Sequence, residues 1–208
     1  MIIAIEGIDG AGKNTLVTAL VERLGAEVIS FPRYKDSIHA QLAQAALYGK
    51  MGDLTDSAYA MATLFALDRR EASAQISEAS RAGKVVLLDR YVASNAAYSA
   101  ARLEDESVVE WVETLEFETL GIPRPDLQIL LATSPELARE RAKNREAQDA
   151  SRARDRYESD DSLQQRTAAA YARLAKQEWQ SPWIVLDPGY DLDAVCEELA
   201  RRVGAETH

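Results

Sequence analysis

Cysteine and histidine are scarce in this sequence of 208 residues, and long apolar runs are missing. Cys196 has no second cysteine with which to form an internal disulfide, and neither His39 nor His208 has a cysteine or histidine neighbour at metal-ligand spacing. The apolar stretches are too short, and too often interrupted by glycine, to form a signal peptide or a membrane span. We therefore expect a cytoplasmic protein with no structural zinc site and no membrane partner.

Positive charge is also in short supply. The chain has 24 lysines and arginines against 34 aspartates and glutamates, which gives a net charge of −10. Binding to nucleic acid through a general surface needs a broad basic face, so this composition argues against a nucleic-acid partner. An anionic ligand must instead be bound by a few cations at one place. The length and an apolar content of 47% suit a single α/β domain that covers residues 1–208.

Three of the ten glycines lie close together in the segment Gly7–Thr15, GIDGAGKNT, whose Lys13 completes the pattern G-x-x-x-x-G-K. Glycines let backbone N–H groups converge on a polyphosphate at a helix start, and the lysine can reach its β- and γ-phosphates. A plain glycine turn with an exposed lysine is the alternative. A strand-like run before the segment and a helical pattern after it favour a phosphate site formed by Gly7, Ile8, Asp9, Gly10, Ala11, Gly12, Lys13, Asn14 and Thr15.

Apolar runs and amphipathic stretches alternate along the chain. Strands are expected at Ile2–Glu6, Glu27–Phe31, Val85–Leu88, Leu127–Ala132 and Trp183–Leu186. Helices are expected at Thr15–Leu24, Ser37–Tyr48, Thr55–Arg81, Ser94–Arg102, Ser107–Leu120, from Pro135 onward, at Glu158–Trp179 and at Leu192–Val203. This alternation predicts the α/β class, with a five-stranded parallel sheet, helices on both faces and right-handed crossovers.

Candidate ligand-binding side chains follow two of the expected strands. Open α/β sheets bind ligands beyond the carboxyl ends of their strands. The segment FPRY at residues 31–34 follows the second strand, although an ordinary strand exit is the alternative there. The third strand ends in Asp89, Arg90 and Tyr91, and a charged pair at such a place is typical of a binding site.

Two helical pairs add further candidates. Phe65 and Arg69 are four residues apart and Asn95 and Tyr98 are three apart, so each pair shares one helix face. A ring beside a guanidinium can stack on a base and bind its edge, although composition alone favours a core position for Phe65.

Arginine is concentrated between residues 139 and 156. Seven of the 24 basic residues fall in these 18 positions, which contain no apolar side chain larger than alanine. A solvated helix end of mixed charge is the alternative. In an acidic protein with a phosphate loop, we favour a lid at about residues 141–156 that closes over phosphates and neutralises their charge.

Five segments together resemble bacterial thymidylate kinases, most closely those of actinobacteria such as mycobacteria. They are GIDGAGKNT at 7–15, FPRY at 31–34, YAMATLFALDR at 59–69, DRYVASNAAYSAAR at 89–102 and RARDRYE at 152–158. The resemblance spans nearly the whole chain. It implies the P-loop nucleoside monophosphate kinase fold and a cytoplasmic homodimer. The implied reaction is phosphoryl transfer from ATP to dTMP, giving dTDP and ADP in dTTP biosynthesis.

The charge requirements of phosphoryl transfer and the resemblance together suggest which phosphate group each cation would bind. Transfer between two anions needs cations on the donor, the acceptor and the moving group. Lys13 then holds the donor phosphates and Arg90 the acceptor phosphate. The resemblance places Arg145 on the transferring phosphoryl, with Arg141 and Arg152 as further lid cations.

The resemblance also implies an acceptor pocket. Phe65 would stack on thymine, Arg69 would bind a carbonyl of the base, and Asn95 its N3 edge. Tyr98 would crowd the 2′ carbon of the sugar, and Phe31 and Pro32, joined by a cis bond, would surround the 5-methyl group. Tyr34, Asp155 and Tyr157 would lie near the sugar and phosphate.

Magnesium is the expected cofactor beside ATP. Asn14 replaces the Ser or Thr that holds Mg²⁺ in such motifs. We therefore expect Asp9 to take a larger share of the ion, with Glu158 as a second, water-mediated ligand that the resemblance implies. A kinase for another nucleoside or nucleotide, and a nucleotide-binding switch without turnover, are the remaining alternatives. For the homodimer, the alanine-rich face of residues 58–66 and the helix around Val108–Leu115 are the expected contacts.

Overall fold

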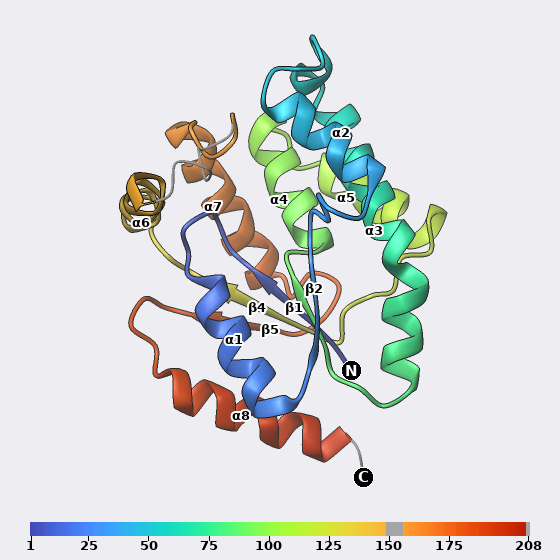
Figure 1. The fold of residues 1–208 in the computed structure, drawn as a ribbon, viewed down its shortest axis with the longest axis vertical. Coiled ribbons are helices and arrows are strands. Elements are labelled where there is room, and N and C mark those ends of the chain that lie inside the picture. The colour runs from blue at the N-terminus through green and yellow to red at the C-terminus, as the bar shows by residue number, and fades with distance from the viewer. Residues whose placement is uncertain (149–155, 207–208) are drawn as a thin grey trace.

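The computed structural model describes residues 1–148 and 156–206, with only the backbone described for residues 142–148, 205 and 206. A five-stranded sheet forms its centre, in the order β2, β3, β1, β4, β5 (Figure 1). Each neighbouring pair is parallel. The strands are β1 (Ile2–Glu6), β2 (Glu27–Ser30), β3 (Val86–Asp89), β4 (Leu127–Leu131) and β5 (Trp183–Leu186). The predicted α/β fold with a five-stranded parallel sheet is confirmed.

The apolar runs of the sequence become the buried centre of this sheet. Every residue of β1 and of β4 is buried, as expected for strands that are covered on both faces. In the register of the central strands, Ile5 of β1 lies beside Asp89 of β3 and Glu6 lies beside Leu130 of β4. The segments that follow β1, β2 and β3 therefore leave the sheet at one edge.

Helices cover both faces of the sheet. Helix α1 (Lys13–Leu24) packs with α8 (Leu192–Glu206) on one face, and α4 (Val92–Leu103) packs with α7 (Asp161–Lys176) on the other (Figure 1). The remaining α-helices are α2 (Ile38–Leu47), α3 (Ala58–Arg81), α5 (Val108–Glu113) and α6 (Pro135–Gln148). Among the described residues, no helix combines the length and the apolar character needed to cross a membrane.

Most expected helices differ by a few residues at one end or both from those observed, and three of the differences have a visible cause or form. Ser57, not Thr55, caps α3; Thr55 lies in a short 3₁₀ turn, η1 (Leu54–Asp56), and its hydroxyl donates to the Ala46 carbonyl at 2.5 Å. The helix expected at 107–120 is split into α5 and a π-helical turn, η2 (Thr114–Thr119). The helix expected at 158–179 is shorter, because Asp160 caps α7 by accepting from the Leu163 N–H.

Candidate functional site

The glycine segment connects β1 to α1 and lies against α6. Gly10 has φ +85°, and a Cβ added to it would lie 2.2 Å from the Ala138 carbonyl oxygen of α6. Only glycine suits both this backbone conformation and this contact. Gly12, also at positive φ, precedes α1 without a side-chain cap, so N–H groups at this helix start remain for an anion.

Lys13 folds back over this loop. Its ammonium donates to the carbonyls of Gly7 and Ile8, at 3.1 Å in each case. Burial lowers the pKa of Lys13 to about 8, helped by the charge of Arg90 and opposed by Asp9, Asp89 and Glu6. The ammonium is thus held in a poorly solvated position where phosphate oxygens would be stronger partners than carbonyls.

The rest of the predicted phosphate site lies around this lysine. Asn14 and Thr15 are exposed in the first turn of α1, whereas Ile8 and Ala11 are buried. The Ala11 carbonyl accepts from Thr133 Oγ1 at 3.1 Å and from Arg141 Nη1 at 3.4 Å. Arg141, a predicted lid cation on α6, therefore reaches the phosphate loop.

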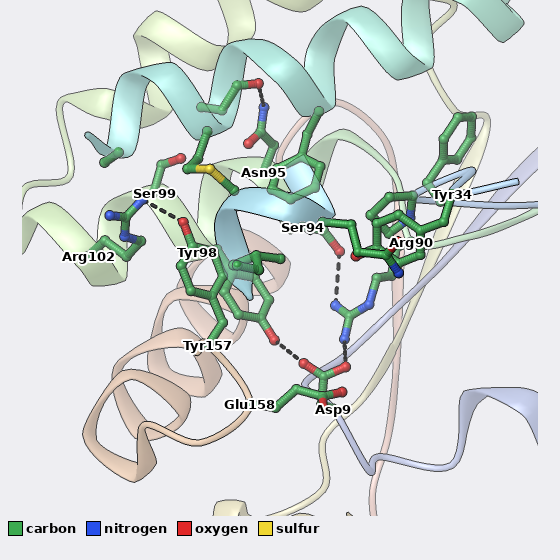
Figure 2. A pocket seen from close by; sticks show the side chains of 18 of the residues that line it. Asp9, Tyr34, Arg90, Ser94, Asn95, Tyr98, Ser99, Arg102, Tyr157 and Glu158 are labelled. Carbon is green, nitrogen blue, oxygen red and sulfur yellow. Dashed lines mark hydrogen bonds and ion pairs between the residues drawn. The ribbon is translucent and has the colours of Figure 1, made fainter. Parts of the chain in front are cut away.

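Asp9 and Arg90 form an ion pair at the same edge of the sheet. Arg90 Nη2 lies 2.5 Å from Asp9 Oδ1, and the Tyr98 hydroxyl donates to Asp9 Oδ2 at 2.9 Å (Figure 2). Burial would raise the pKa of Asp9, but the charges of Arg90 and Lys13 and these hydrogen bonds outweigh it and hold the pKa below its usual value. Asp9 therefore interacts with both predicted phosphate cations, which belong to one site.

A buried polar network supports Arg90 from behind. The Glu6 carboxylate accepts from the Tyr91 N–H at 2.9 Å, the Ser94 hydroxyl at 2.6 Å and the Tyr171 hydroxyl at 3.0 Å. Arg90 Nη1 in turn donates to Ser94 Oγ at 3.3 Å and to the Tyr171 hydroxyl at 3.5 Å. Arg90 has φ +65°, a left-handed conformation that is uncommon outside glycine and turns the chain sharply between β3 and α4.

Next to Arg90 a cavity of about 350 Å³ opens between α2, α3, α4 and the segment that begins at Tyr157 (Figure 2). All predicted dTMP-binding residues that the structure describes line this cavity. They are Asp9, Phe31, Pro32, Tyr34, Phe65, Arg69, Arg90, Asn95, Tyr98 and Tyr157, and the predicted metal ligand Glu158 joins them. The size and mixed lining suit a ligand with an apolar body and a few polar groups.

The predicted loop after β2 forms one wall of the cavity. The peptide bond between Phe31 and Pro32 is cis, as the family resemblance implied. Arg33 points away from the cavity toward α3 and pairs with buried Asp68, with Nε 2.9 Å from Oδ1. The Arg33 N–H also donates to Asp68 Oδ2 at 2.9 Å. Asp68 thereby fixes the position of the loop, which no sequence pattern had predicted.

Phe65 combines features of both alternatives, because it packs against a small cluster of buried apolar residues and also forms part of the cavity wall. It is partly exposed and lines the cavity beside Arg69. Arg69 itself is buried and bound to Glu116, with Nε 2.6 Å from Oε2. Burial alone would lower the pKa of Arg69. The charge of Glu116 and its hydrogen bond to Arg69 have the larger effect, so the pKa of Arg69 is raised.

The lid lies partly outside the described residues. Arg145 belongs to α6, four residues beyond Arg141, and only its backbone is described. Arg152 and Asp155 lie outside the described residues. Tyr157 is buried; its ring stacks on Tyr98, with centroids 6.0 Å apart, and its hydroxyl accepts from Arg102 at 2.5 Å (Figure 2).

Three further residues adjoin the site. No pattern had assigned a role to Arg102 or Glu116, and Asp89 had been noted only as one of a charged pair at the end of its strand. Arg102 lies four residues after Tyr98 on α4, a spacing that could have revealed it. Asp89 ends β3, and its Oδ1 is buried with no hydrogen-bond partner among the described residues. No sequence pattern pointed to Glu116, because the surrounding residues have the composition of an ordinary helix.

The family of this chain follows from comparison with known proteins. A family model described as thymidylate kinase matches residues 5–197, which include the glycine segment and the cavity-lining residues. The chain belongs to the thymidylate kinase family. The family predicted from the sequence segments is confirmed, and the chain is that of a kinase.

Individual relatives agree with this family. The thymidylate kinase of Mycobacterium tuberculosis is 53% identical over an alignment of 208 residues. The alignment covers 96% of this chain and 97% of the relative. The thymidylate kinase of Xanthomonas campestris is 36% identical, with 95% of this chain and 80% of the relative covered. The solved structure of thymidylate kinase from Candida albicans has the same fold, with a TM-score of 0.75 at 22% identity, and the match covers 99% of this chain and 92% of that one.

Proposed function

We propose that this protein transfers the γ-phosphoryl group of ATP to dTMP and produces dTDP and ADP. The observation that supports this most directly is the position of Asp9. It contacts Arg90 at the mouth of the base-sized cavity and experiences the charge of Lys13 in the phosphate loop. Two nucleotides bound at these places would meet with their phosphates between the two cations. The whole chain would act as one kinase domain with a lid at about 141–156.

The acceptor would bind in the cavity. Phe65 offers a ring for stacking, and Arg69 and Asn95 offer polar groups for the base edge. Phe31 and Pro32 would contact the 5-methyl group, and Tyr34 and Asp155 the sugar and phosphate. Arg90 would bind the acceptor phosphate with its planar guanidinium after releasing Asp9.

The chemical step would need positioning more than proton transfer. An oxygen of the acceptor phosphate attacks the γ-phosphorus while the bond between that phosphorus and the ADP oxygen breaks. The attacking oxygen is already ionised, so no general base is required. The negative charge of the transition state is shared among the acceptor phosphate and the β- and γ-phosphates of ATP. It would be neutralised by Lys13, Arg90, Arg141 and Arg145.

The described residues fit a magnesium ion that is completed by ligands from the nucleotides. No cluster of three potential metal-binding side chains occurs within the described ranges. Mg²⁺ commonly takes one or two carboxylates together with phosphate oxygens and water. Asp89 Oδ1, which is buried and lacks a partner among the described residues, adds a candidate to Asp9 and Glu158. When bound, the ion would neutralise phosphate charge.

Replacement of Asp9 by asparagine tests this placement. We expect kcat to fall about tenfold or more, and half-maximal activity to require more Mg²⁺, because the variant loses one carboxylate of the site. A magnesium titration at fixed ATP would measure both effects. Asp105→Asn, on an exposed turn, is the control. An unchanged magnesium dependence in Asp9→Asn would contradict the role of Asp9.

Replacement of Tyr98 by alanine tests sugar selection. Tyr98 lies between Asp9 and Tyr157, held by the hydrogen bond and the ring stack described above. Removing the ring should raise kcat/KM for ribothymidine monophosphate relative to dTMP about tenfold, because the space beside the 2′ carbon opens. Tyr98→Phe keeps the ring and should keep the discrimination. An unchanged ratio in Tyr98→Ala would remove the residue from this role.

A nucleotide panel tests the proposed function as a whole. The protein would be incubated with ATP, Mg²⁺ and one of dTMP, dUMP, dCMP, dAMP or thymidine, and ADP formation would be followed. We expect the highest kcat/KM with dTMP. Preference for thymidine would point to a nucleoside kinase, and nucleotide binding without ADP formation would point to a switch.

A cytoplasmic homodimer completes the proposal. The alanine-rich face of residues 58–66 is unsuited to the contact, because Ala58, Met61, Ala62 and Ala66 are buried within the subunit. Exposed Tyr59, whose ring meets Trp111 edge to face with centroids 4.8 Å apart, offers apolar surface from the two predicted segments instead. Sedimentation at micromolar concentration should give a dimer, and a monomer would contradict it.

A further inference from the structure

Glu116 joins the two polar residues at the base end of the cavity but does not line the cavity itself. It lies in the π-helical turn η2 and is fully buried. Its carboxylate accepts from Arg69 Nε at 2.6 Å, from Arg69 Nη2 at 2.7 Å and from Asn95 Nδ2 at 2.7 Å. One carboxylate thus fixes two side chains that come from two different helices, α3 and α4.

The contacts of Asn95 determine which end of its amide faces the cavity. An asparagine amide has two N–H donors on Nδ2 and an acceptor, Oδ1. One donor is used by Glu116 and the other by the Ala62 carbonyl at 3.0 Å. Rotating the amide by half a turn would place Oδ1 against two acceptors. The Oδ1 acceptor therefore remains for a ligand in the cavity that Asn95 lines.

The contacts of Arg69 leave hydrogen-bond donors, where those of Asn95 leave an acceptor. Glu116 takes Nε and one N–H of Nη2 in a two-point ion pair. A guanidinium carries five N–H donors, so three of them, the two on Nη1 and the second on Nη2, remain for the cavity that Arg69 lines. The base end of the cavity presents an acceptor from α4 and donors from α3.

We propose that Glu116 is a positioning residue that sets the hydrogen-bond polarity with which the base is read. An acceptor beside a donor matches a 4-oxopyrimidine, which has a donor at N3 and an acceptor at O4. The same pair mismatches a 4-aminopyrimidine, which has an acceptor at N3 and a donor at N4. This inference rests on the proposed function. It assigns to Glu116, which would not touch the ligand, a part in the preference for dTMP and dUMP over dCMP.

Glu116→Gln is the decisive variant because it is nearly isosteric. A glutamine amide can accept from Arg69 only through Oε1 and presents its Nε2 donors toward Asn95. The variant thus loses one of the two acceptors that hold the Asn95 amide in its orientation, and only the Ala62 carbonyl remains. We expect kcat/KM for both dTMP and dUMP to fall relative to dCMP, by about tenfold or more, since a buried polar group that faces a mismatched partner loses its hydrogen bond. The KM for ATP should stay unchanged, because the Glu116 carboxylate is bonded to Arg69 and Asn95 at the base end of the cavity and not to the phosphate loop.

Two further variants make the test independent of folding defects. Glu113→Gln changes a half-exposed carboxylate three residues earlier and should leave all ratios unchanged. Glu116→Asp keeps the negative charge but retracts the carboxylate by one methylene, so both side chains keep an acceptor as partner and a smaller loss of discrimination is expected. Melting temperatures would identify any variant that is unfolded at the assay temperature.

The outcomes separate this inference from the proposed function. Wild-type protein that fails to phosphorylate dTMP would overturn the proposed function. Active wild-type protein whose Glu116→Gln and Glu116→Asp variants lose activity equally toward dTMP, dUMP and dCMP would overturn the inference, because Glu116 would then support only the fold. A selective loss with the two 4-oxopyrimidines would support it.

Discussion

Replacing Arg145 by alanine is expected to lower kcat by about 10³- to 10⁵-fold, the range for an arginine that contacts a transferring phosphoryl group. Arg145 lies in α6, whose earlier residue Arg141 donates to the phosphate loop at Ala11. A contact made chiefly in the transition state contributes little to binding of the ground state. The affinity for dTMP should therefore stay nearly constant, which single-turnover kinetics and equilibrium binding would measure separately.

Arg139 supplies the control for this variant. It lies on the same helix and pairs with exposed Asp161 at 2.7 Å. Arg139→Ala removes an arginine from α6 without removing a predicted phosphate contact, so kcat should change only a few-fold. An equal loss of dTMP affinity and kcat in Arg145→Ala would show that Arg145 binds the acceptor in the ground state.

Replacing Lys13 by methionine should reduce kcat/KM for ATP by about 10³-fold, because a charged contact to phosphate in a poorly solvated site is worth several kcal/mol. The thermal stability should change little. Burial already disfavours the ammonium and lowers its pKa to about 8, so its removal relieves a desolvation cost. Loss of the two hydrogen bonds to Gly7 and Ile8 opposes that gain.

Calorimetric ATP binding and a thermal melt of the same variant would test both parts. Lys84→Met, which removes an exposed lysine paired with Glu27 at 2.5 Å, is the control and should leave ATP binding intact. Retention of near-normal turnover in Lys13→Met would contradict the donor-phosphate role. A large fall in melting temperature would show that the lysine mainly stabilises the loop.

The cations of the site are paired with internal groups in this structure. Lys13 is bound to loop carbonyls, and Arg90 is bound to Asp9, Ser94 and Tyr171. Such partners keep the charges satisfied and hold the side chains near their working positions. Phosphate oxygens would replace them with stronger, charge-assisted bonds. Lys13 and Arg90 of the proposed site are therefore already paired with polar groups of the protein in this structure.

Local patterns in the sequence were enough for the sheet and the phosphate loop. The buried runs of β1 and β4 and the glycine segment Gly7–Thr15 carry their own signals, because strand burial, glycine conformation and helix starts depend on neighbouring residues. The structure brings Phe65, Asn95 and Tyr98, which the family segments singled out, to one cavity. Errors fell at helix ends, as at Thr55, where a tertiary contact to Ala46 competes with capping, and within the expected helix at 107–120, which is split in two.

Only the tertiary structure decided how the polar groups of the site are paired. Arg69 meets Glu116 across 47 residues, and Tyr98 meets Asp9 across 89. The sequence predicted that a guanidinium and an amide would face a ligand, but not which donors and acceptors would be left for it. That remainder depends on which buried partner each side chain meets when separate helices pack together, and such long-range pairing leaves no periodic pattern along the chain.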